Sequence, residues 1–123
     1  MDHRSIARIT AAGRVAIGAA LLIAPRAATR AWIGEPGGQP GAQLLARGLG
    51  GRDLILGLGV INALDRGDPR AQDWVRASAL ADGADAVGTA LAFRHLPKRS
   101  RFGVLLLAGG AAVVGFVAAD NLD

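Results

Sequence analysis

The chain has 123 residues, of which 51% are hydrophobic and 20% are charged, and its formal net charge is +4 at pH 7. This length predicts a single domain, residues 1–123, and the apolar content excludes a disordered chain because there is ample surface to bury. The absence of cysteine excludes disulfides, thiolate metal sites and cysteine nucleophiles. Two histidines are too few for a His-based metal centre, so we expect no metal and no cofactor.

Charge-poor stretches alternate with short polar clusters along the chain. The first stretch covers residues 5–24 and ends where Pro25 cannot continue a helix. Residues 34–41 are rich in glycine and proline, and we expect no regular element there. The second stretch covers residues 42–64. The turn that follows it predicts Pro69 at the first position of the next helix.

The third stretch covers residues 70–96 and ends at Pro97, and the fourth covers residues 102–119. Alanine and leucine dominate all four stretches, and each is far longer than the usual strand of about 5–6 residues. Helix is therefore favoured throughout. Four helices with short connections predict an all-α fold, an antiparallel four-helix bundle with up-and-down topology.

Hydropathy and glycine content predict that these helices cross a membrane. A span needs about 20 mostly apolar residues, and residues 102–119 contain no charge. The other three stretches hold internal charges, so a soluble Ala-rich bundle is the alternative. A soluble helix should show a wide polar face, however, and residues 54–64 and 102–119 show none. Glycine also weakens helices in water but is tolerated in lipid, where the helix is enforced. We expect four transmembrane helices in a lipid bilayer.

Small residues recur at every fourth position in three of the helices, a pattern typical of close helix packing in lipid. These stripes are Ala12, Ala16, Ala20 and Ala24 in the first helix, Ala79 and Gly83 in the third, and Ala111, Gly115 and Ala119 in the fourth. In a chain so rich in alanine and glycine, any single stripe can also arise from composition alone. Taken together with the membrane prediction, the three stripes indicate a homo-oligomer.

Six charged residues lie within the predicted spans, where a charge that faces lipid would cost a few kcal/mol or more. They are Arg14, Arg47, Arg52, Asp53, Asp82 and Asp85. Three are cationic and three are anionic, so their formal charges sum to zero. This balance predicts that they pair with one another inside the bundle.

The polar faces of the second and third helices predict which charges pair. Asp82 and Asp85 share one face of the third helix, and Arg52 lies with Asn62 on a polar stripe of the second. Because arginine presents a planar fork that matches a carboxylate, we expect Arg52 to pair with Asp82 or Asp85.

Asp53 lies about 100° around the helix from its neighbour Arg52. We therefore expect Asp53 to reach a different partner, either Arg14 or Arg47. In the structural interpretation, Arg14, Arg47, Arg52 and Asn62 form an ion-pair network with the aspartates and hold the helices in register.

Intramembrane carboxylates also carry out acid–base chemistry or transport, which gives a second interpretation. In it, Asp82, Asp85 and Asp53 are the candidate catalytic residues of a membrane-embedded enzyme. The reaction would be isomerase- or cyclase-like chemistry on an apolar small molecule such as an isoprenoid or polyketide. Proton- or ion-coupled transport is a third possibility, but it needs inverted repeats or broken helices, for which four short spans leave little room.

The basic segment at residues 94–101 is a candidate for binding nucleic acid or anionic lipid. Aromatic residues make up only 4% of the chain and tyrosine is absent, so there are few platforms on which bases could stack. We therefore expect no nucleic acid partner and assign this segment to the membrane surface. The first and third loops hold six cations against four on the opposite side, which predicts both termini outside the cytoplasm.

The segment RGLGGRDLILG at residues 47–57, with Gly-Arg at 13–14 and Asp-Gly-Ala-Asp at 82–85, resembles a bacterial family of small four-helix membrane proteins. The family is catalogued as domain-of-unknown-function 4267. The likeness covers residues 9–119, and its most specific element is Gly-x-Arg-Asp-x-x-x-Gly at residues 50–57. The resemblance implies a multi-pass protein of the bacterial inner membrane and singles out Arg52, Asp53, Asp82 and Asp85. It implies no substrate.

Overall fold

The computed structural model describes residues 1–122. Within them the fold is all-α, as predicted, with five α-helices, two short 3-10 helices and no strand. The α-helices are α1 (His3–Ile23), α2 (Pro25–Ile33), α3 (Pro40–Arg66), α4 (Ala71–Leu91) and α5 (Lys98–Asp120), and the 3-10 helices are η1 (Glu35–Gly38) and η2 (Phe93–His95). The four long helices match the four predicted stretches.

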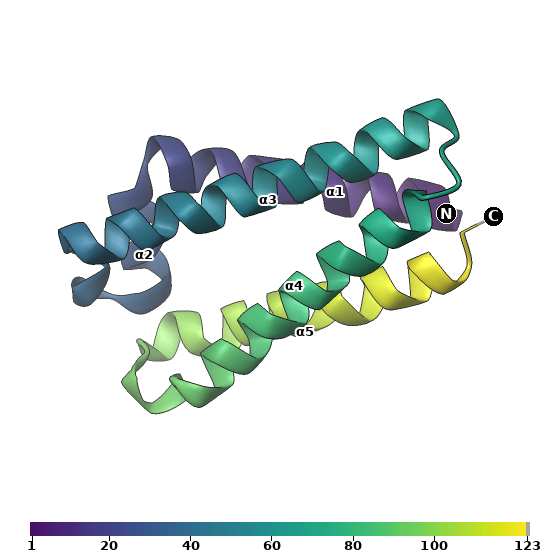
Figure 1. Ribbon diagram of the computed structural model, residues 1–123. Coiled ribbons are helices and arrows are strands. Elements are labelled where there is room, and N and C mark those ends of the chain that lie inside the picture. The colour runs from purple at the N-terminus through teal and green to yellow at the C-terminus, as the bar shows by residue number, and fades with distance from the viewer. Residues whose placement is uncertain (123) are drawn as a thin grey trace.

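The long helices form two antiparallel pairs. α1 packs along α3, and α4 packs along α5. The two pairs approach each other at the end that holds both termini and the turn between α3 and α4, and they diverge toward α2 (Figure 1). The fold is therefore two helical hairpins that are joined most closely at one end.

The structure corrects the prediction for the segment that follows α1. α1 ends at Ile23, before Pro25, as predicted. Pro25 then occupies the first position of a second helix, α2, where its missing N–H costs nothing. Residues 35–38, where no regular element was expected, form η1. The Thr29 hydroxyl donates to the Gly37 carbonyl at 2.6 Å, so η1 folds back onto α2. The prolines and glycines of this segment correctly indicated that the long helix ends here. They did not indicate the two short helices, α2 and η1, that precede α3.

Three other helix ends also differ from the prediction. Gly67 ends α3 in the left-handed conformation with φ 62°, Pro69 lies in the turn that follows, and α4 begins at Ala71. α4 ends at Leu91 rather than at residue 96, and η2 occupies part of the difference. α5 begins at Lys98, four residues before the predicted start, so the basic segment at residues 94–101 is divided between η2 and the first turn of α5.

The main cluster of buried apolar side chains lies at the closed end of the two hairpins. It consists of Ala7, Ala11, Val60, Ala63, Leu64, Ala71, Val75, Ala118 and Ala119. Most of these side chains are small, which lets the four long helices approach one another closely there. This cluster packs the two hairpins together at the end that holds both termini. It does not extend to the end at which α2 lies.

Two glycines mark a close approach of α1 to α3. A Cβ on Gly18 would lie 2.7 Å from the Gly50 carbonyl oxygen, and one on Gly50 would lie 2.8 Å from the Gly18 carbonyl oxygen. In the other hairpin, a Cβ on Gly115 would lie 2.9 Å from the Ala79 Cβ, which confirms that these two predicted stripe members pack together. The alanine stripe at residues 12–24 is instead exposed.

We expect Gly18→Ala to destabilise the protein by about 1–3 kcal/mol, because the added methyl must push α1 away from α3. Gly13→Ala is the matched control, since a Cβ at Gly13 has no atom within 4 Å. That substitution should leave the stability unchanged or raise it by up to about 1 kcal/mol through helix propensity. Thermal melts in detergent micelles of both variants measure the difference. Equal melting temperatures would contradict the contact.

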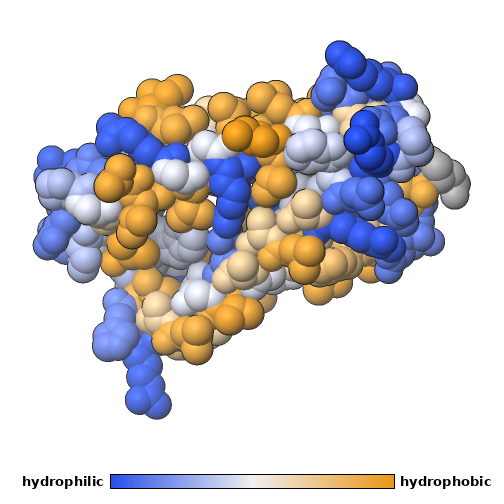
Figure 2. Space-filling view, viewed as in Figure 1, coloured by the Kyte–Doolittle hydropathy of each residue, from blue (hydrophilic) through white to orange (hydrophobic). Residues whose placement is uncertain are grey.

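The surface between the polar ends of the molecule is largely apolar (Figure 2). Large hydrophobic side chains are exposed on all four long helices, for example Ile23, Leu45, Leu91 and Leu106 at 83%, 72%, 84% and 74%. Among the described helices, α1 and α5 are each long and apolar enough to cross a membrane. α3 and α4 do not meet that criterion.

Candidate functional site

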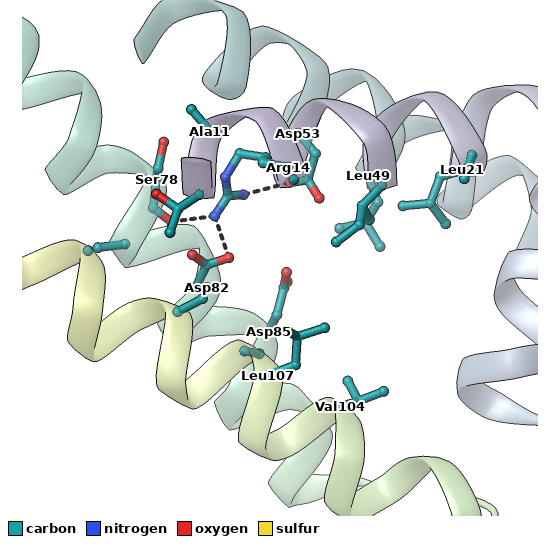
Figure 3. Close-up of a pocket in the computed structure, with 18 of the residues that line it drawn as sticks. Ala11, Arg14, Leu21, Leu49, Asp53, Ser78, Asp82, Asp85, Val104 and Leu107 are labelled. Atoms are coloured by element: carbon teal, nitrogen blue, oxygen red, sulfur yellow. Dashed lines mark hydrogen bonds and ion pairs between the residues drawn. The ribbon is translucent and has the colours of Figure 1, made fainter. Parts of the chain in front are cut away.

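Arg14 joins the two hairpins from the middle of α1. Its Nη1 donates to Asp53 Oδ1 on α3 at 2.9 Å, and its Nη2 donates to the Ser78 carbonyl on α4 at 3.0 Å. Nη2 also forms an ion pair with Asp82 on α4 (Figure 3). The Arg14 side chain is only 8% exposed. One buried guanidinium thus connects three helices, and the predicted pairing of Asp53 with Arg14 is confirmed.

Arg52 makes a second connection between α3 and α4. Its Nη1 and Nη2 donate to Asp85 Oδ1 and Oδ2 at 3.1 and 2.7 Å, a bidentate pair that confirms one of the two predicted partners. Its Nε and Nη2 also donate to Asp53 Oδ1 at 3.1 and 2.9 Å. We expected Asp53 to pair with a residue other than its sequence neighbour Arg52. It also accepts from Arg52, because the long arginine side chain can reach the adjacent carboxylate.

Arg47 and Asn62 lie outside this network. Both side chains are exposed, and within residues 1–122 neither makes an ion pair or a side-chain hydrogen bond. The buried face of α3 consists of Ala46, Gly50, Asp53, Gly57, Val60, Ala63 and Leu64. Arg47 and Asn62 are not on that face. The spacing of residues in the sequence could not indicate which face of α3 is buried. Their inclusion in the predicted network was wrong.

The Arg/Asp network therefore consists of Arg14, Arg52, Asp53, Asp82 and Asp85. Two guanidinium groups and three carboxylates give a formal charge of +2 − 3 = −1. The neutrality that the sequence predicted depended on Arg47, which the fold places on the surface.

A cavity of about 570 Å³ lies between the two hairpins beside the network. Its polar wall is formed by Arg14, Asp53, Asp82 and Asp85, with Thr10 and Ser78. The remaining lining residues are apolar or glycine and come from all five α-helices. Figure 3 shows Asp82 and Asp85 at this wall, with Leu107 and Val104 of α5 beyond them. Both carboxylates are ion-paired, and both nevertheless border an open space.

The opening of the cavity lies along α1 and α5, and its far end is lined by α2. Ile17 on α1 and Leu107 on α5 line the cavity and are 46% and 62% exposed. Trp32 of α2 lines it as well. The Ser100 hydroxyl donates to the Trp32 carbonyl at 2.8 Å and ties α2 to the start of α5. Pro25, a helix-start signal, was the available clue to α2.

No family model, curated protein or solved structure matches the chain. Membership of the family suggested by the motifs at residues 13–14, 47–57 and 82–85 therefore stays a prediction.

Proposed function

We propose that this chain is a multi-pass integral membrane protein with a structural or accessory role, in which α1, α3, α4 and α5 span the bilayer. The Arg/Asp network joins its two hairpins at the level where a lone charge would be most costly. The observation that carries the proposal is the inverted distribution of polarity: Arg14 and Asp53 are 8% and 7% exposed, whereas large aliphatic side chains cover the outside.

Such a surface would be unfavourable in water, since contiguous apolar patches beyond a few hundred Å² mark contact with a membrane or a partner. Only 28% of the span in α1 and 17% of that in α5 is buried inside the protein, unlike the core helix of a soluble domain. In a bilayer the same side chains face lipid. The bilayer is therefore the medium in which this arrangement is stable.

The low hydropathy of α3 and α4 is compatible with spanning, because the charges near the middle of both helices point inward. Arg47, in the second turn of α3, is exposed, and in a bilayer its long side chain would have to extend toward the headgroups. Arg52, Asp53, Asp82 and Asp85 are all engaged in the network. On the outside, α3 exposes Leu44, Leu45, Ile55 and Leu58, and α4 exposes Leu80, Val87 and Leu91. With 27 and 21 residues, these helices are about 40 and 30 Å long at 1.5 Å per residue, enough to cross.

The proposal includes self-association and a place in the bacterial inner membrane. The exposed alanine stripe of α1 offers a smooth face on which a second copy could pack. The resemblance to the bacterial family supports the location.

Single-cysteine labelling tests the number of spans, since the chain has no native cysteine. Four spans place Gln39, between η1 and α3, and Arg66, at the end of α3, on opposite sides of the membrane. A membrane-impermeant maleimide should label Arg66→Cys in intact cells and Gln39→Cys only after lysis, given the predicted orientation. The reverse pattern would change only the orientation. Labelling of both from the same side would mean that α3 does not cross.

A membrane-embedded enzyme that uses Asp82 or Asp85 is the second candidate, and the cavity beside these residues favours it. The ion pairs favour the structural role, because the Arg52 guanidinium occupies both oxygens of Asp85. Of these two carboxylates, only Asp82 has an oxygen, Oδ2, that no arginine binds within residues 1–122.

A further inference from the structure

The network at the cavity wall has one carboxylate more than it has guanidinium groups. No residue that lines the cavity from α2 or α5 is ionisable, and the cations of these helices (Arg26, Arg30, Lys98, Arg99 and Arg101) are not among the lining residues. The charged groups around the cavity are Arg14 from α1, Asp53 from α3 with Arg52 behind it, and Asp82 and Asp85 from α4. The wall carries a formal charge of −1 in apolar surroundings.

The excess charge is most accessible at Asp82. Both oxygens of Asp85 are bound by Arg52. Asp53 accepts from two guanidinium groups, both at Oδ1, and although its Oδ2 has no partner among residues 1–122, its side chain is only 9% exposed. Asp82 pairs through Oδ1 with Arg14, and within residues 1–122 its Oδ2 has no hydrogen bond or ion pair. Its side chain is 18% exposed and lines the cavity. A cation that entered the cavity would meet Asp82 Oδ2.

The rest of the cavity is suited to an apolar body. Its volume of about 570 Å³ lies within the range of small-molecule sites, about 300–1,000 Å³. The part of its wall next to α4 is formed by Val104, Leu107, Ala108 and Ala111 of α5. In such a medium an unbalanced negative charge strongly favours a counter-cation and excludes anions.

We infer that this cavity binds an apolar organic cation, an amine or onium group carried on a hydrophobic body, with the cationic centre beside Asp82 and the body between α1 and α5. The exposed Ile17 and Leu107 at the opening let such a molecule enter from the hydrocarbon phase. This route of access rests on the proposed membrane location, whereas the binding itself does not. A proton on Asp82 neutralises the empty site, so protons and organic cations compete for it.

Tetraphenylphosphonium and tetraphenylborate provide the test, because they share size and shape but have opposite charge. The full chain is titrated with each in neutral detergent micelles, with the fluorescence of Trp32 as the signal in a Trp74→Phe background. The chain has only these two tryptophans. We expect saturable quenching by the cation at pH 8, at least tenfold weaker binding of the anion, and loss of cation affinity as the pH falls and Asp82 takes up a proton.

Asp82→Asn should weaken binding of the cation at least tenfold. Asp65→Asn is the control, since Asp65 is an exposed carboxylate paired with Arg8 outside the cavity, and it should bind as the parent does. If Asp82→Asn fails to fold, Ala111→Leu decides, because it narrows the cavity and leaves every charge in place. It should weaken binding of the cation.

Equal binding of the two ions would overturn the inference, as would unchanged cation affinity in a folded Asp82→Asn or in Ala111→Leu. The number of spans is measured separately by cysteine labelling. A chain that spans four times but does not bind the cation would keep the proposed membrane role and lose this site.

Discussion

Arg14→Ala is expected to lower the free energy of unfolding by about 3–5 kcal/mol, the loss typical of a buried ion pair from which one partner is removed. The substitution leaves Asp82 without its guanidinium, takes one donor from Asp53 and leaves the Ser78 carbonyl without its side-chain donor. It also cuts the connection between α1 and α4 beside the cavity. Thermal or denaturant unfolding in detergent micelles measures the change.

Arg47→Ala is the matched control for Arg14→Ala. Arg47 is the same residue type, lies on α3 and is exposed. Its replacement should change the stability by no more than about 0.5 kcal/mol, as at most surface positions. Arg14→Lys should recover only part of the loss, since an ammonium group lacks the planar fork that reaches two helices at once. If Arg14→Ala unfolds at the same temperature as Arg47→Ala, the network does not hold the hairpins together.

Arg52→Ala should cost about 3 kcal/mol, at the low end of that range because the Arg52 side chain is 31% exposed. Combined with Asp85→Asn, it should be less destabilising than the sum of the two single changes, since the double variant leaves no unpaired charge at this contact. We expect a coupling energy of about 2 kcal/mol, within the range for residues in direct contact. Unfolding of the parent, both single variants and the double variant completes the cycle.

A second cycle on Arg8 and Asp65 supplies the reference for this measurement. Their ion pair is 2.6 Å long, but the two side chains are 48% and 55% exposed. Exposed pairs of this kind typically couple by about 0.2–1 kcal/mol. If Arg52 and Asp85 couple no more strongly than Arg8 and Asp65, then Arg52 is present for a purpose other than joining α3 to α4.

The Arg/Asp pairs show how far residue spacing can reach. Complementary charges on adjacent helices have few alternatives in an apolar interior, so the pairing of Arg52 with Asp85 and of Arg14 with Asp53 was predictable. Spacing could not indicate that Arg14 also reaches Asp82, because that contact depends on how the first hairpin sits against the second.

What the sequence determined by itself is the all-α class, the positions of the four long helices and the existence of an interior charge network. These features depend on local helix propensity, on breakers such as Pro97 and Gly67, and on the cost of an unpaired charge in an apolar medium. Helix propensity and breakers depend on a few neighbouring residues, and the cost of an unpaired charge depends only on the charge and the apolar medium.

The tertiary structure decided which face of α3 is buried, and with it the outward position of Arg47, the excess negative charge of the network and the cavity beside Asp82. The face that α3 turns toward α1 is marked by Gly50 and Gly57, whose backbones lie against Gly18 and Ala11. A helical repeat specifies which side chains share a face. Only packing against a second helix selects the face that turns inward.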